Sequence, residues 1–183
     1  MPDYVALLRA VNVGGRFAKM AHLRAGLVTA GFQDVESYIQ SGNLRLTSDL
    51  QATELAPALE ATLQELCGFT VRAILRTPGQ LAALTAYGAA LAAPLEGEVR
   101  RYVTFLAEDP PDDLVTTMNG WDIAGERARV HGQEIYQWLA VPSHQAKLSN
   151  ARIERRGVVA TTRDWKVVLT LGQMWGGGPT GER

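Results

Sequence analysis

The most informative segment in the first half of this chain is Val35-Glu36-Ser37-Tyr38-Ile39-Gln40-Ser41-Gly42-Asn43-Leu44-Arg45-Leu46-Thr47-Ser48. Residues 35–40 and 43–48 alternate between apolar and polar side chains, which is typical of two strands. Ser41-Gly42 lies between them, where a short turn can close a β-hairpin. The stretch therefore predicts two antiparallel strands joined at 41–42.

The segments on either side of this hairpin complete a regular order of elements. Residues 4–11 form an apolar run that predicts a strand, and Met20 to Ala30 carry apolar residues at helical spacing. After the hairpin, a leucine stripe predicts a helix over 55–66, and residues 70–76 alternate like a strand. Thr77-Pro78 is typical of the start of a third helix. The resulting order, β-α-β-β-α-β, is the ferredoxin-like pattern.

The second half begins again with an alternating strand, at 99–107. A short helix is expected near 111–118, followed by a hairpin whose strands, 127–130 and 134–139, flank His131-Gly132. Helices are expected near 147–156 and from about Arg163 to Met174, so a helix replaces the last strand. The predicted fold class is α+β, with two ferredoxin-like sheet-and-helix halves packed together. The expected boundaries are 1–88, a connector at 89–97, a modified half at 98–175 and a flexible tail at 176–183.

The composition sets limits on the class of protein. The 183 residues are 46% hydrophobic and 20% charged, with a net charge of −1, which excludes a disordered chain and a global attraction to nucleic acid. Cys67 is the only cysteine, so an internal disulfide is excluded and a reducing compartment is favoured. The N-terminus lacks the pattern of a signal peptide, and no apolar stretch is long enough to span a bilayer. We therefore expect a cytoplasmic protein without membrane contact.

Four segments carry a resemblance to a known family. They are Leu8-Arg9-Ala10-Val11-Asn12-Val13-Gly14-Gly15, Tyr38-Ile39-Gln40-Ser41-Gly42-Asn43, Ala146-Lys147-Leu148 and Ala160-Thr161-Thr162-Arg163-Asp164-Trp165. With them the chain resembles the bacterial domain-of-unknown-function 1697 family over nearly its whole length. The resemblance implies two ferredoxin-like halves and no assigned activity. Family members usually carry Gly where this chain has Ala10, and Asn where it has Asp164.

The predicted topology brings two of these segments together. In the order β-α-β-β-α-β the first two strands run in the same direction, two positions apart, so the loops that follow them lie roughly 10 Å apart on one edge of the sheet. Gly14 and Gly15 leave backbone N–H groups uncovered, and the following helix adds a positive partial charge. Arg16 and Lys19 add full charges. These features suit a small anion such as a phosphate or a carboxylate.

We therefore predict an anionic ligand, and no cofactor or metal, at this edge. The alternative is that the glycines and serine only form turns, since Gly, Asn and Ser dominate turns for conformational reasons. Arg9 shares a strand face with Val5 and Leu7, and it either binds the ligand or forms an internal salt bridge, for instance with Glu36. The candidate ligand-binding residues of this edge are Arg9, Asn12, Gly14, Gly15, Lys19, Gln40, Ser41 and Asn43.

Alternation also predicts a polar face on the first sheet. An arginine-rich face with an aromatic residue resembles platforms that bind single-stranded nucleic acid. The alternative is that the second half covers this face or that its charges are solvated. The residues expected on it are Tyr38, Gln40, Asn43, Arg45, Arg72 and Arg76.

The segment Thr161-Thr162-Arg163-Asp164-Trp165 is typical of a helix start, with Thr161 as the cap and Asp164 three residues on. Arg163 opposes the dipole of such a helix, which favours an outside partner. Lys147 and Arg163 are therefore candidates for a second anion contact.

Catalytic patterns are weak. The three histidines, His22, His131 and His144, have no metal-ligand spacing, and Cys67 has no nearby base in sequence. The acidic cluster at 108–113 is interpreted as a solvated turn, with a divalent cation as the alternative. Three functions stay open: a binding module for a nucleotide, phosphate or nucleic-acid backbone, a small enzyme using the same cleft, or a scaffold protein. By analogy of fold, the halves could also form a homo-oligomer through sheet edges.

Overall fold

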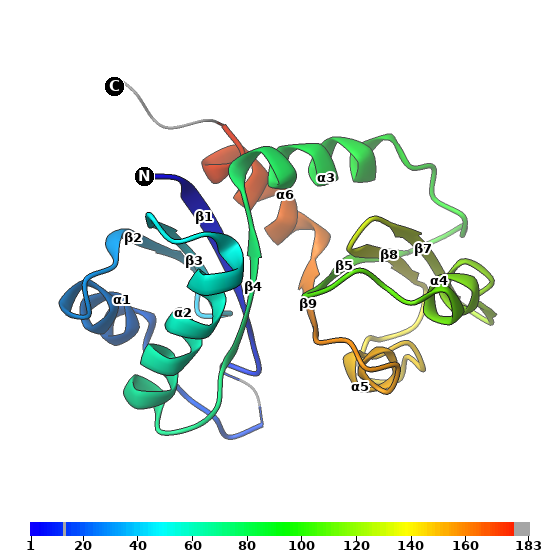
Figure 1. Cartoon of the computed structure of the whole chain (residues 1–183). Coiled ribbons are helices and arrows are strands. Elements are labelled where there is room, and N and C mark those ends of the chain that lie inside the picture. The colour runs from blue at the N-terminus through cyan, green and yellow to red at the C-terminus, as the bar shows by residue number, and fades with distance from the viewer. Residues whose placement is uncertain (13, 178–183) are drawn as a thin grey trace. The chain divides into compact units, whose positions relative to one another are not determined.

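A computed structural model describes residues 1–12 and 14–177 (Figure 1). The chain divides into two units, Met1–Ala82 with Leu171–Arg183, and Ala83–Thr170. Each unit combines helices with one antiparallel sheet, so the expected α+β class is confirmed. Of the predicted tail at 176–183, residues 178–183 lie outside the described residues.

The first unit has a four-stranded sheet in the order β2-β3-β1-β4. All neighbouring strands are antiparallel, with Leu7 opposite Asn43 on one side and opposite Ile74 on the other. The elements follow the order predicted from the sequence. They are β1 (Asp3–Arg9), α1 (Met20–Thr29), β2 (Gln33–Tyr38), β3 (Asn43–Thr47), α2 (Ala52–Cys67), β4 (Arg72–Arg76) and the start of α3 (Pro78–Ala90), whose residues from Ala83 on belong to the second unit.

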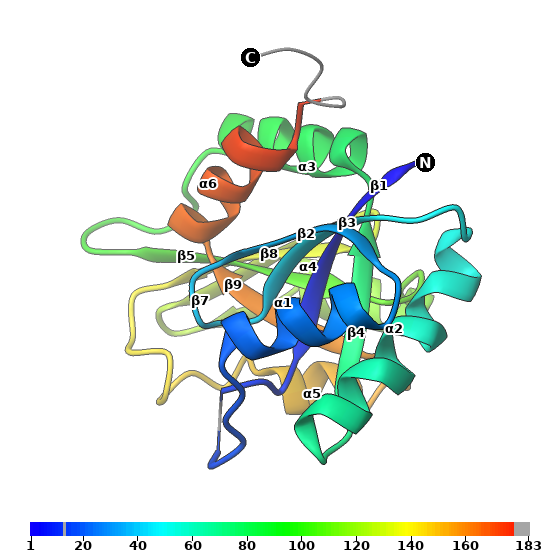
Figure 2. The ribbon, with the colours of Figure 1, turned by 90° about the vertical axis from the view of Figure 1, so that its left-hand side faces the viewer.

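Helices α1 and α2 lie together against one face of this sheet (Figures 1 and 2). Their apolar stripes, with Leu23 and Leu27 from α1 and Leu59 and Leu63 from α2, are fully buried with Leu8 of β1. Burying a leucine side chain stabilises a fold by roughly 1.5–3 kcal/mol, so these stripes fix both helices on the sheet. Because β1 lies inside the sheet, its residues 4–8 are all buried.

The second unit has a five-stranded sheet in the order β6-β7-β8-β5-β9. Its helices α4 and α5 bury Leu114, Met118 and Ile153 against Leu106 and Ile135 of the sheet. The elements are β5 (Arg100–Leu106), α4 (Asp112–Asn119), β6 (Asp122–Ile123), β7 (Glu126–His131), β8 (Glu134–Leu139), α5 (Asn150–Glu154), β9 (Ala160–Asp164) and the start of α6 (Trp165–Trp175), whose residues from Leu171 on belong to the first unit. The hairpin predicted around His131-Gly132 is confirmed.

The prediction of a helix from about Arg163 is wrong at its start. Residues 160–164 form β9, which pairs antiparallel with β5, and α6 begins only at Trp165. The carboxylate Oδ1 of Asp164 accepts the Lys166 N–H at 2.8 Å, so Asp164 caps the helix from the last residue of the strand. The second unit therefore keeps a closing strand. The helix predicted near 147–156 is also shorter, because Ser149 caps it at Asn150.

Candidate functional site

The loop edge of the first unit is formed by residues 10–19 and 39–43, without Val13, which lies outside the described residues. Strands β1 and β2 are both antiparallel to β3, so they run in the same direction and end on one edge of the sheet, at Arg9 and Tyr38. Hydrogen bonds join the two segments at this edge. The predicted convergence of the two loops is therefore confirmed.

The side chains of Asn12 and Gln40 hold the two segments together. Asn12 donates its amide N–H to the Gln40 carbonyl and accepts the Ala18 N–H at 2.8 Å. The Gln40 side-chain oxygen accepts the N–H of Met20, the first residue of α1, at 3.4 Å. Both side chains therefore shape the loop through backbone groups.

The hairpin turn is equally well fixed. Gly42 has a φ of 77°, its carbonyl accepts the Leu8 N–H at 2.8 Å, and a Cβ at this position would lie 2.9 Å from Cβ of Leu8. Only glycine fits this left-handed close approach without strain. Asn43 is fully buried and donates to the Tyr38 carbonyl at 3.1 Å and to Oγ of Ser41 at 2.9 Å. The predicted turn at 41–42 is confirmed.

The other candidate groups of the loop edge face solvent. Gly14 and Gly15 are exposed, with φ values of 58° and 83° and nothing within 4 Å of the Cβ position. Lys19 is exposed, precedes α1 as its N-cap and makes no side-chain capping bond. Arg16 lies over the ring of Phe69, 5.7 Å from its centroid. At this edge the side-chain amides of Asn12 and Gln40 therefore bind backbone groups, whereas Gly14, Gly15 and Lys19 are exposed.

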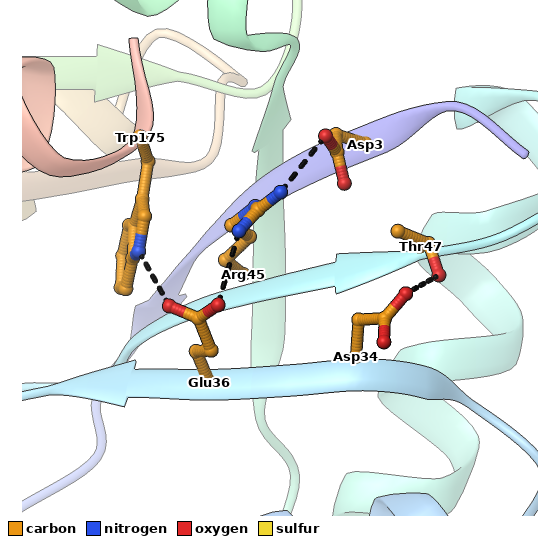
Figure 3. Close-up of polar contacts among 6 residues, drawn as sticks. All are labelled: Asp3, Asp34, Glu36, Arg45, Thr47 and Trp175. Carbon is orange, nitrogen blue, oxygen red and sulfur yellow. Dashed lines mark hydrogen bonds and ion pairs between the residues drawn. The ribbon is translucent and has the colours of Figure 1, made fainter. Parts of the chain in front are cut away.

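The strand register places the predicted residues Asn43, Arg45, Arg72 and Arg76 on one face of the first sheet, but this face also carries the buried apolar residues Val5, Leu7 and Ile74. Its charged residue Arg45 is paired with two carboxylates (Figure 3). Arg45 forms ion pairs of 3.0 Å with Asp3 and with Glu36, and Glu36 also accepts the Trp175 indole N–H at 3.0 Å. Burial alone would lower the pKa of Arg45, but the bonds and charges of the two carboxylates outweigh it, so this pKa is raised. Glu36 therefore has Arg45 as an ion-pair partner.

Other residues predicted on this face are buried, form ion pairs or lie outside the strands. Asn43 and Arg76 are buried, and Arg72 forms a 3.0 Å ion pair with Glu60. Arg9 is half-buried and lies opposite Arg72 in the register of β1 and β4. Gln40 lies in the turn after β2 and not in a strand.

Lys147 and Arg163 belong to the second unit. The Lys147 residue is exposed, whereas Arg163 is buried in β9 and donates to Oγ1 of Thr161 and to the Thr162 carbonyl. Burial lowers the pKa of Arg163 to about 10. Sequence reasoning had placed both residues in one anion contact, and the structure gives them different environments.

Glu126 is a residue that the sequence analysis missed. It is buried, and its carboxylate accepts the N–H groups of Lys147 at 2.8 Å and Leu148 at 2.9 Å, together with the Trp121 indole N–H at 3.2 Å. A carboxylate that accepts three hydrogen bonds fixes the backbone of the Ala146-Lys147-Leu148 segment. The sequence holds no signal for this role, because the burial of Glu126 and its backbone partners become visible only in the folded unit.

Comparisons with known proteins give the family of this chain. A family model described as a protein of unknown function, DUF1697, matches residues 1–136. The chain belongs to the DUF1697 family. The structure is similar to that of the conserved bacterial protein SP0830 from Streptococcus pneumoniae, with 25% identity, a TM-score of 0.74, and coverage of 96% of this chain and 98% of that one. A search of curated proteins gives no match.

The two departures from the usual DUF1697 pattern now have a structural meaning. Ala10, where family members usually carry Gly, has a φ of 65°, in the left-handed region that favours glycine. Asp164, where they usually carry Asn, caps α6 through one carboxylate oxygen, a role that an asparagine oxygen can also fill. The first departure costs free energy and the second preserves the cap.

Groups for chemistry in this DUF1697 chain are scattered. Within residues 1–12 and 14–177, no three His, Cys, Asp or Glu side chains are placed to hold a metal ion. The imidazole of His131 stacks on Tyr87 with ring centroids 3.7 Å apart. Burial raises the pKa of the Cys67 thiol, which lowers its reactivity. No helix among the described residues is long and apolar enough to cross a membrane.

Proposed function

We propose that this protein is a binding module for a small anionic ligand, such as a nucleotide, a phosphate or a nucleic-acid backbone, at the loop edge of its first unit. The proposal rests on one observation. Hydrogen bonds of Asn12 and Gln40 fix the loop backbone, and Gly14, Gly15 and Lys19 of the same loop are exposed to solvent. The proposed residues are Arg9, Asn12, Gly14, Gly15, Lys19, Gln40, Ser41 and Asn43.

These residues divide into two roles under the proposal. Asn12, Gln40, Ser41 and Asn43 form the frame, because their side chains hydrogen-bond to the loop backbone and to each other. Gly14 and Gly15 present backbone N–H groups, and Lys19 presents a charge at the start of α1. Within α1 the first turn carries no acidic residue, so its positive dipole end is available to an anion.

A thermal-shift panel of phosphate, sugar phosphates, nucleotides and short oligonucleotides tests this proposal. A ligand at ten times its Kd stabilises the folded state by about 1.4 kcal/mol, which raises the Tm by a few degrees for a chain of this size. We expect Lys19→Gln to weaken the binding about tenfold, since it removes a charge-assisted contact. No stabilisation by any member of the panel at millimolar concentration would contradict the proposal.

Arg24→Gln is the matched control for this test. Arg24 is an exposed cation on the same helix, α1, but it lies away from the N-terminus. Arg24→Gln changes the net charge by the same amount as Lys19→Gln. Equal losses of ligand affinity in the two variants would therefore mean that the ligand responds only to overall charge.

A second candidate is a scaffold protein in which the motifs only fix turns. It is favoured by the buried Asn43 and by the two bonds of the Asn12 amide, which serve the backbone. In that case Asn12→Ala lowers stability, while no ligand of the panel changes the Tm of the unaltered protein. The panel therefore separates the two candidates.

Several further predictions belong with this proposal. The shared order β-α-β-β-α-β supports ferredoxin-like units, and Lys147 and Arg163 stay candidates for a second anion contact. The boundaries at 1–88, 89–97 and 98–175 are supported by the lack of helix and strand between Ala90 and Arg100. A cytoplasmic location is supported by the single cysteine.

A further inference from the structure

The second unit contains a hollow beside the family segment that ends in Asp164 and Trp165. Its volume is about 530 Å³, within the range of small-molecule sites. An adjacent hollow of about 430 Å³ shares Glu98 and Arg100 with it. The residues that line the larger hollow include Glu98, Arg100, Arg101, Asp164, Trp165 and Lys166.

The aromatic wall of this hollow is held in place from two sides. The guanidinium of Arg101 lies 4.5 Å from the centroid of Trp165 and 5.5 Å from that of Trp138, and it donates to the Gly88 carbonyl at 2.6 Å. At Gly88, a Cβ would lie 2.5 Å from Cη2 of Trp165, so the indole packs directly on the backbone of α3. Trp165 is therefore fixed, yet it is only half-buried and lines the hollow.

The charges of the hollow are mixed but mainly positive. Arg100 and Lys166 are exposed, and with Arg101 they bring three cations against the carboxylates of Glu98 and Asp164. One oxygen of Asp164 is used by the Lys166 N–H. A simple inorganic anion would gain from the cations but not from the indole or the carboxylates. An apolar ligand would gain only from the indole.

We propose that this hollow binds a nucleoside 5′-monophosphate. The base lies against the exposed part of the Trp165 ring, beside the contacts with Arg101 and Gly88, an amino group on the base donates to Asp164 or Glu98, and the phosphate binds Arg100 and Lys166. Aromatic side chains bind bases by stacking, and arginine and lysine bind phosphate through charge-assisted hydrogen bonds. Bases that carry an amino group, such as adenine, are preferred over uracil. This site is separate from the loop edge, because every residue that lines it belongs to the second unit.

Titration with AMP, followed by tryptophan fluorescence and by calorimetry, tests the proposal. We expect saturable quenching by AMP, and at least about tenfold weaker binding of UMP, adenosine, ribose 5-phosphate and inorganic phosphate. The double variant Arg100→Gln/Lys166→Gln changes two exposed residues, so it should fold, and we expect its Kd for AMP to rise by at least about tenfold. Arg155→Gln, an exposed cation of the same unit outside the hollow, should leave the Kd unchanged.

Three results would overturn this assignment. The first is the lack of saturable AMP binding at millimolar concentration in both measurements. The second is an unchanged Kd for AMP in the double variant. The third is equal quenching of tryptophan fluorescence by inorganic phosphate and by AMP at the same concentrations, which would mean that no base contacts the indole. Lys19→Gln should leave the quenching of tryptophan fluorescence by AMP unchanged, whatever it does to anion binding at the loop edge, so failure of this site and failure of the loop edge are distinguishable.

Discussion

At the scale of single residues, backbone strain gathers at the loop edge. Among the described residues, four non-glycine residues have a positive φ, and three of them, Ala10, Asn12 and Ile39, lie at or beside the two loops. Asparagine tolerates this region, but alanine and β-branched isoleucine do so at a cost. Residues in strained conformations persist where the surrounding structure fixes them, and they often occur at functional sites.

Ala10→Gly should stabilise the protein. A left-handed conformation costs alanine roughly 1–2 kcal/mol, and glycine loses about 0.4–1 kcal/mol through its freer unfolded state, so the net gain is about 1 kcal/mol. Urea unfolding with an unchanged m-value measures it. The control is Ala30→Gly, since Ala30 has a φ of −77° and glycine there brings only the entropic loss. An Ala10→Gly variant no more stable than the parent chain would show that Ala10 is not strained.

Residue-scale predictions from the sequence succeeded where the signal is local. The turn at Ser41-Gly42 needs a residue that tolerates positive φ, so the glycine in the sequence predicts the turn directly. For Asn12, the sequence predicted only that its loop lies near the loop of Gln40. It could not predict the hydrogen bonds of Asn12 with Ala18 and Gln40, because the partner atoms are backbone groups that every residue carries. Glu126 was missed because its two backbone partners, Lys147 and Leu148, are about twenty residues further on, and an acid after Gly125 resembles any solvated strand start.

Among the elements, helix α3 has a start fixed by local capping and a C-terminal part fixed by packing. Its start is a reciprocal cap, in which Gln80 N–H donates to Oγ1 of Thr77 at 3.2 Å and Thr77 N–H donates to Oε1 of Gln80 at 2.8 Å. The sequence predicted this start from Thr77-Pro78. Near its C-terminal end, Gly88 provides the close approach on which Trp165 and Tyr136 pack.

The same substitution at two glycines of α3 should therefore have opposite effects. Gly88→Ala should lower the free energy of unfolding by about 1–3 kcal/mol, because the new methyl group would lie 2.5 Å from Trp165 and 2.7 Å from Tyr136. Gly79→Ala should raise it by up to about 1 kcal/mol, since its Cβ would meet nothing closer than Oγ1 of Thr77 at 4.0 Å and alanine favours the helix. Denaturant unfolding compares both with the parent chain. Equal effects of the two changes would contradict the packing described for Gly88.

The strand β9 shows why one element was predicted wrongly. Thr161 and Arg163 are buried on one side of a five-residue strand, but Thr-Thr-Arg-Asp has the composition of a helix cap. Helix α6 follows without any loop, so the strand and the cap of the helix share Asp164. A local pattern could not separate the two, because the deciding factor is the pairing with β5 some sixty residues earlier.

At the scale of the whole molecule, the order of elements was the most predictable property. Both units contain a strand, a helix, a hairpin, a helix and a closing strand, and in both the first strand of this series pairs with the third and the last. Hydrophobic periodicity indicates the type of each element and turn residues indicate its ends, so the order of elements could be predicted from the sequence. Ligands leave no such periodic signal, so the candidate sites depend on how loops and side chains converge in the folded units.

We propose that the loop edge of the first unit presents Gly14, Gly15 and Lys19 to a small anion. The most direct test is a phosphate titration followed by the ¹⁵N–¹H resonances of the backbone amides. We expect the amides of Gly14 and Gly15 to shift in a saturable way, with a midpoint that rises about tenfold in Lys19→Gln and stays unchanged in Arg24→Gln. Resonances of Gly14 and Gly15 that stay in place at millimolar phosphate would contradict the account.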